Sequence, residues 1–317
     1  MFDTHCHLNF SRFKNRIDEV IQNALASGVD HFIVPGTDIE SSKKAIEITN
    51  KYENVYAAVG IHPHHVFKMI ESVILATTPS VRGRSPESAD SGVVASLLPR
   101  MTMEIQSLKK LLESKKVVAV GEVGMDRHFY QKTKYEAYQV DEKLIKMQKE
   151  LLELQIQLAI KHNKSIIFHN RETKKEIMDV IKRNWDKKLE GRTVFHCCEP
   201  DDVGTNRELS LLEFAKEHKM FIGVDGDVTY RKEKQEFIKK VPLEMLVLET
   251  DSPFLLPHPQ RQQAGLRGGQ AEPLQFSNEP KNIKVIAEFI AYLTNTPMNR
   301  FIGVTTLNAR KLFQLPE

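Results

Sequence analysis

Six residues with metal-binding side chains stand at the ends of short apolar segments of this chain. They are His5, His7, Glu122, His169, His196 and Asp251. Imidazole and carboxylate groups are the ligands with which proteins hold divalent cations. Because side chains alternate along a strand, His5 and His7 point to one face and can chelate one ion. Taken singly, each residue is also compatible with a structural role, so a metal site requires that the fold bring them together.

The segments that must position these residues predict an α/β fold. Eight short apolar runs predict strands, at Phe2–His7, His31–Pro35, Val55–Ile61, Val117–Val123, Ser165–His169, Thr193–Cys197, Met220–Val224 and Leu246–Thr250. Runs such as Val117–Val120 are almost entirely apolar, which is typical of parallel strands buried on both faces. Amphipathic segments predict helices at Asn15–Ser27, Asp141–His162, Asn282–Leu293 and Asn299–Phe313. Eight strands with helical connections favour a (β/α)8 barrel of the TIM type, and a doubly wound sheet stays open as the alternative.

In such a barrel the carboxyl ends of the strands form one face, where active sites lie. The six candidate ligands come from five different strand ends, so the barrel would gather them in one place. Two cations about 3.5–4 Å apart need a bridging group, which a carboxylate can supply. Glu122 and Asp251 are the two carboxylates of the set, and two divalent ions would leave a surplus of about +2, which favours an anionic substrate such as a phosphodiester.

Composition and charge exclude several classes of protein. The chain has 317 residues, with 45 basic and 42 acidic side chains and a net charge of +3. That balance excludes a protein held on nucleic acid by charge alone. No apolar run reaches the ~18 residues of a membrane span, and the N-terminal residues do not resemble a signal peptide. The three cysteines, Cys6, Cys197 and Cys198, cannot form a disulfide framework, so we expect a cytoplasmic protein.

Two stretches of unusual composition interrupt the alternation of strands and helices. Residues 77–100 are rich in Ser, Pro and Gly, and residues 257–273 are rich in Pro, Gln and Gly. Such composition is typical of long loops. We therefore expect one barrel domain over residues 1–317 with loop insertions at 77–100 and 257–273. The second insertion follows the eighth strand, and its Arg261 and Arg267 are candidates for contacts with backbone phosphates.

Several motifs resemble those of the TatD family of metal-dependent deoxyribonucleases, in the amidohydrolase-like barrel superfamily. They are HCH at residues 5–7, GIHPH at 60–64, GEVGMD at 121–126, FH at 168–169, FHC at 195–197, ETDSPFL at 249–255, NEP at 278–280 and NARKLF at 308–313. The likeness spans nearly the whole chain, and the ETDSPFL run within the ordered set makes it specific. Two segments, Cys197–Pro200 and Gly223–Asp227, and the two insertions depart from the family pattern, and all lie where substrate would bind.

The resemblance implies a metal-dependent deoxyribonuclease that acts as an exonuclease through two divalent cations, with Mg²⁺, Mn²⁺ and Zn²⁺ left open. It implies that His5, His7 and Asp251 hold the first ion and that His169 and His196 hold the second. Glu122 would bridge the two, and Asp251 would also accept the proton of the attacking water. The implied partner is DNA, as a single strand or a strand end. The choice between DNA and RNA, the polarity and the oligomeric state, a monomer included, stay open.

Three further residues are candidates for substrate binding. His62 and His64 follow the third strand, where they either contact a phosphate or cap and pack a helix. Arg171 follows His169 by two residues and can clamp a phosphate through two parallel hydrogen bonds; a surface ion pair is the alternative.

Two other functions remain open at this stage. The same barrel and metals could hydrolyse an ester, an amide or a lactone, for example the ester of an aminoacyl-tRNA. A catalytically inactive scaffold is the other alternative, although all six ligand positions hold competent residues.

Overall fold

The computed structural model describes residues 1–69, 101–130, 139–200, 210–263 and 277–316. Its eight strands are β1 (Phe2–Asp3), β2 (His31–Pro35), β3 (Val55–Val59), β4 (Val117–Asp126), β5 (Ser165–Arg171), β6 (Thr193–Phe195), β7 (Phe221–Val224) and β8 (Leu246–Leu248). They form one sheet in chain order, and all seven neighbouring pairs are parallel. Its labelled α-helices are α1 (Ile17–Ala26), α2 (Ile39–Thr49), α5 (Glu142–His162), α6 (Lys174–Arg183), α7 (Leu211–Glu217), α8 (Lys232–Ile238), α9 (Gln260–Gln263), α10 (Ile283–Leu293) and α11 (Met298–Phe313), and residues 101–111 are also helical.

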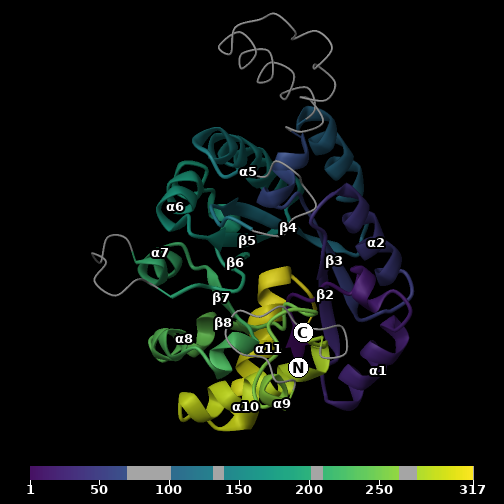
Figure 1. The fold of residues 1–317 in the computed structure, drawn as a ribbon, viewed down its shortest axis with the longest axis vertical. Coiled ribbons are helices and arrows are strands. Elements are labelled where there is room, and N and C mark those ends of the chain that lie inside the picture. The colour runs from purple at the N-terminus through teal and green to yellow at the C-terminus, as the bar shows by residue number, and fades with distance from the viewer. Residues whose placement is uncertain (70–100, 131–138, 201–209, 264–276, 317) are drawn as a thin grey trace, which may run out of the picture.

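The sheet closes on itself between the ends of β1 and β8. The Thr4 N–H donates to the Leu248 carbonyl at 2.9 Å, and the His7 N–H donates to the Ser252 carbonyl at 2.7 Å. Figure 1 shows the helices arranged around the strands, as expected when each strand is followed by a helix that returns the chain. The predicted (β/α)8 barrel is therefore confirmed, and a doubly wound sheet, which would stay open, is excluded.

Apolar side chains fill the barrel and close one of its ends. The interior contains one or more apolar residues from each strand, among them Phe2, Ile33, Ala58, Ala119, Ile167, Val194, Phe221 and Val247. Ala309, Leu312 and Phe313 of α11 pack against this layer. They close the barrel at the amino ends of the strands. The carboxyl ends therefore form the open face, where the candidate ligands lie.

Element boundaries differ from the predictions by a few residues, with one informative exception. The predicted strand Phe2–His7 is too long, because the chain bends at Thr4 after a two-residue β1. Phe2 faces the barrel interior. Strict alternation would turn His5 to the opposite face, and the bend instead lets both His5 and His7 face the site.

The first predicted insertion lies outside the described residues, and the second is described only as far as residue 263. Residues 77–100 and 264–273, which include Arg267, thus lie outside the described ranges. Residues 257–263, the described part of the second insertion, pack onto the barrel. The Arg261 side chain is buried there, and its guanidinium lies 5.0 Å from the centre of the Tyr230 ring. The expectation that Arg261 is available to phosphates is therefore wrong. No helix in the described ranges is both long and apolar enough to cross a membrane.

Candidate metal centre

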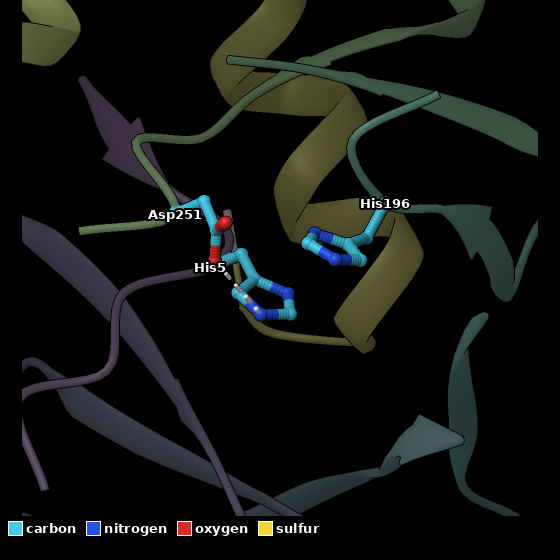
Figure 2. A group of neighbouring side chains, drawn as sticks. All are labelled: His5, His196 and Asp251. Atoms are coloured by element: carbon cyan, nitrogen blue, oxygen red, sulfur yellow. Dashed lines mark ion pairs between the residues drawn. The ribbon is translucent and has the colours of Figure 1, made fainter. Parts of the chain in front are cut away.

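The six predicted ligands meet at the open end of the barrel. Glu122 lies in β4 and His169 in β5, whereas the other four follow the ends of β1, β6 and β8 within four residues. His5, His7, Glu122 and His196 are at least 95% buried. Figure 2 shows His5, His196 and Asp251 reaching toward one another from three separate elements. Side chains at the carboxyl ends of five strands are thus neighbours, as their positions in the sequence predict.

Glu122 lies at the centre of this cluster, and its two carboxylate oxygens face different histidines. Oε2 is 3.6 Å from Nε2 of His5 and 3.7 Å from Nε2 of His7. Oε1 is 2.8 Å from Nδ1 of His169 and 3.1 Å from Nε2 of His196. Asp251 faces the first pair, with Oδ1 3.4 Å from His7 Nε2 and 3.8 Å from His5 Nε2. The cluster therefore divides into two ligand groups that share Glu122.

The donor set fits divalent cations. The Nε2 atoms of His5 and His7 point at each other across 3.2 Å, which places two ring nitrogens at one position beside two carboxylates. Nδ1 of His169 is buried and points at Oε1 of Glu122, 2.8 Å away. Two triads, His5–His7–Glu122 and Glu122–His169–His196, each place their ligand atoms within 4.8 Å of one another. Such mixed imidazole and carboxylate sets are typical of Zn²⁺, Mn²⁺ and related ions.

The protein's own charges shift the pKa values of these groups strongly. Burial alone raises the pKa of Glu122, but the facing imidazoles, led by His196 and His62, hold it well below its usual value. Burial alone lowers the pKa of His169, but Asp126 and Glu122 outweigh it and raise the pKa to about 9. The pKa of His5 is lowered, first by burial and then by His196. Glu122 is therefore ionised, as a cation ligand must be.

Two further carboxylates lie behind His169 and His196, the histidines that face Oε1 of Glu122. Neither carboxylate is among the six ligands expected from the sequence. Oδ2 of Asp126 is 3.1 Å from Nε2 of His169, and Oε1 of Glu249 is 3.5 Å from Nδ1 of His196. A carboxylate on the far nitrogen of a ligand histidine fixes its ring and raises its basicity. The signal was present, because Asp126 ends the GEVGMD motif and Glu249 begins ETDSPFL.

Gly223 makes the position of Glu249 possible. A Cβ atom at residue 223 would lie 2.5 Å from Oε2 of Glu249, closer than real contacts allow. Glu249 itself is 1% exposed and also accepts a hydrogen bond from the Cys197 N–H at 2.5 Å. Both segments that depart from the family pattern therefore contribute to holding this carboxylate.

The extra carboxylates change the charge of the site. The expected surplus of about +2 counted Glu122 and Asp251 only and is wrong, because Asp126 and Glu249 contact the ligand histidines. The pKa of Asp126 is lowered despite burial, chiefly by the hydrogen bond with His169, so Asp126 is ionised. Two divalent ions would face four carboxylates here, so the substrate assignment cannot depend on a net positive site.

The three candidate substrate residues occupy different places. His62 lies inside the cluster, with Nε2 3.4 Å from Oε1 of Glu122. His64 packs edge-on against Tyr130, with ring centres 5.0 Å apart. Arg171 donates from Nη1 to the Tyr130 hydroxyl at 3.1 Å, and that hydroxyl donates to Oδ2 of Asp126 at 2.7 Å. Arg171 is thus joined through Tyr130 to the carboxylate behind His169.

A separate buried ion cluster lies beside the site, between β7 and α8. The Nζ of Lys234 is 2.7 Å from Oδ2 of Asp225 and 2.6 Å from Oδ1 of Asp227. All three side chains are at least 95% buried. The Asp225 carboxylate is therefore ion-paired with Lys234.

A parallel barrel with this histidine and carboxylate centre at its open face defines a metal-dependent hydrolase. The chain belongs to the TatD related DNase family, whose family model matches residues 2–314. It is 30% identical over 317 residues to the uncharacterized metal-dependent hydrolase YabD of Bacillus subtilis, with 99% of each chain covered. It is 27% identical over 320 residues to the 3'-5' ssDNA/RNA exonuclease TatD of Erwinia tasmaniensis, covering 99% of this chain and 100% of that one.

Among solved structures, the fold is similar to that of YjjV, a TatD homologue from Escherichia coli. The TM-score is 0.71 at 26% sequence identity, over 100% of this chain and 98% of the other. A hydrolase of the TatD family from Entamoeba histolytica gives a TM-score of 0.67 at 22% identity, over 99% and 97% of the two chains, which again shows the barrel fold.

Proposed function

We propose that this protein is a deoxyribonuclease that removes nucleotides from the ends of DNA strands with two divalent cations. The observation that carries the two-metal proposal is the division of Glu122, whose Oε1 and Oε2 face different histidine pairs. A carboxylate placed in this way can ligate two ions at once. The relative named a 3'-5' ssDNA/RNA exonuclease supports nucleic acid as the substrate.

In this proposal His5, His7 and Asp251 hold the first ion, and His169 and His196 hold the second. The ions are Mg²⁺, Mn²⁺ or Zn²⁺, and Glu122 is the shared ligand. When bound, such cations polarise a phosphoryl group and lower the pKa of water at the site. Asp126 and Glu249 keep the rings of the second pair oriented toward Glu122.

Asp251 is placed to handle the proton of the attacking water. Its side chain is 14% exposed, whereas that of Glu122 is 5% exposed, so water and substrate reach Asp251 more readily. A carboxylate at the mouth of the site that contacts both His5 and His7 can accept a proton without leaving the ligand group. Asp251 and Glu122 are thus the proposed catalytic residues.

His62, His64 and Arg171 remain the proposed substrate-binding residues. His62 directs its ring to Glu122 and His169 and is the closest of the three to the proposed ions. Arg171 lies further out, above Tyr130, where its guanidinium can meet a neighbouring phosphate. We also propose a cytoplasmic protein, supported by a content of three cysteines that cannot form a disulfide framework, and one domain over residues 1–317 with insertions at 77–100 and 257–273.

The test compares two substrate classes on one purified sample. Chelator-treated enzyme should not cleave end-labelled single-stranded DNA, and adding Mg²⁺ or Mn²⁺ should restore stepwise shortening from one end. Metal analysis of the reloaded enzyme should give two ions per chain, and Glu122→Gln should hold fewer. Turnover of a small ester and lactone panel without DNA cleavage would move the assignment to the ester, amide or lactone alternative. Absence of both activities with bound metal would favour the inactive scaffold.

A further inference from the structure

An exposed aromatic side chain stands beside the first ligand group. Phe254 follows Asp251 by three residues and is 41% exposed. Its ring centre is 6.4 Å from that of His7 and 6.1 Å from that of Phe10, and it stands nearly perpendicular to both rings. Phe10 in turn stacks on His7, with ring centres 4.3 Å apart. One edge of the proposed metal centre is thus aromatic.

The backbone around Phe254 is held firmly. The Phe254 N–H donates to the Asp251 carbonyl at 2.9 Å. The side-chain amide of Asn278, which is fully buried, donates to the carbonyls of Phe254 at 2.8 Å and Thr250 at 2.9 Å. An apolar ring on so rigid a loop is presented to solvent in a defined orientation, which lowers the entropic cost of binding something against it.

We propose that Phe254, supported by Phe10, is the platform on which the nucleobase next to the scissile phosphate stacks. This inference rests on the proposed nuclease function. A phosphate held at the ligand groups of His7 and Asp251 carries its base one sugar away, and Phe254 presents an exposed ring beside His7 on that side. Stacking on an aromatic side chain accepts every base, because each base has a π face. The platform would therefore favour nucleic acid over small esters without imposing a sequence.

The test separates base recognition from hydrolysis by comparing two substrates of equal length and charge. One is a short oligothymidylate, and the other is the all-abasic strand with the same sugars and phosphates. The measured quantity is the ratio of kcat/KM for the two substrates in the wild type and in variants of residue 254. We expect the wild type to prefer the strand with bases and Phe254→Leu to reduce that preference about tenfold, or about 1.4 kcal/mol, because the base loses its aromatic stacking partner.

Three variants make the result specific. Phe254→Leu keeps an apolar side chain of similar size, so a loss of preference reports the missing aromatic face. Phe254→Trp should keep or increase the preference. Tyr292→Ala removes another exposed aromatic, 87% exposed at the end of α10, and should leave the ratio as in the wild type.

The outcomes distinguish this inference from the function on which it rests. If the wild type cleaves both strands and Phe254→Leu keeps the wild-type ratio, the platform is overturned and the nuclease function stands. If the wild type cleaves neither strand, both are overturned. If Phe254→Leu is poorly folded, Phe254→Trp decides, because a tryptophan that abolishes the preference for bases overturns the stacking role.

Discussion

The carboxylate behind His169 gives the sharpest prediction about this metal centre. In Asp126→Asn the side chain keeps its shape, and its oxygen still accepts the hydrogen bond that the His128 N–H donates at 2.7 Å. The change removes the negative charge 3.1 Å from the far nitrogen of His169. Loss of such a partner weakens metal binding about 10- to 100-fold. We expect the second ion to bind about 100-fold more weakly.

Glu249→Gln offers a graded comparison on the other histidine of the same group. Its Oε1 is 3.5 Å from Nδ1 of His196, a longer contact than that of Asp126 with His169. We therefore expect a smaller effect, about tenfold, which corresponds to about 1.4 kcal/mol. Neither change contacts His5 or His7 directly, so the affinity of the first ion should change by less than about threefold, within ordinary context effects.

The assay is isothermal calorimetry of chelator-treated enzyme titrated with Mn²⁺, which resolves one binding step for each ion. Glu279→Gln is the matched control, since Glu279 is also buried but pairs with Arg16 and Lys281 away from the site. Its two binding steps should equal those of the wild type. The reasoning fails if Asp126→Asn binds both ions with wild-type affinity, or if Glu279→Gln weakens the second ion as much.

Four other outcomes are expected. Glu122→Gln should lower the affinity for both ions by more than about tenfold each, whereas His169→Ala should lower only the affinity for the second ion. Wild-type affinity for the first ion in Glu122→Gln would contradict the bridging role. The pKa of His169 is raised to about 9, and, against the effect of burial, Glu122 also raises the pKa of His196, so a cation must displace a proton from each ring; affinity for the second ion should therefore fall by up to about a hundredfold per pH unit as the pH drops from about 8 to 6, and a flat profile would disagree. Gly223→Ala should displace Glu249 and weaken the second ion about tenfold in the same titration, and an unchanged second step would show that the carboxylate is not needed there. Lys234→Met should lower the free energy of unfolding by about 3–5 kcal/mol, measured by denaturant titration, since the buried and ionised Asp225 loses its cation; a loss under about 1 kcal/mol would mean that Asp225 is neutral.

Much of the fold could be predicted from the sequence because each strand and each helix has its own local pattern of apolar residues. Each strand buried on both faces is an apolar run, and each helix has its own amphipathic period. The strand His31–Pro35 begins and ends where predicted, and the helix expected at Asp141–His162 starts at Glu142 with Asp141 as its N-cap. The positions of the candidate ligands at strand ends followed from the same pattern, since parallel strands in a barrel expose their carboxyl ends together.

Features that depend on contacts between distant segments could be decided only by the tertiary structure. The bend at Thr4 turns His5 inward because the chain there bonds to residues after β8, almost 250 positions away. Asp126 and Glu249 lie behind histidines of other strands, and Gly223 matters because its missing side chain leaves room for a carboxylate of the next strand. The burial of Arg261 against Tyr230 also depends on a contact between segments that are distant in the sequence. Residue type and local period determine which element a residue occupies, whereas the register between elements determines which side chains it meets.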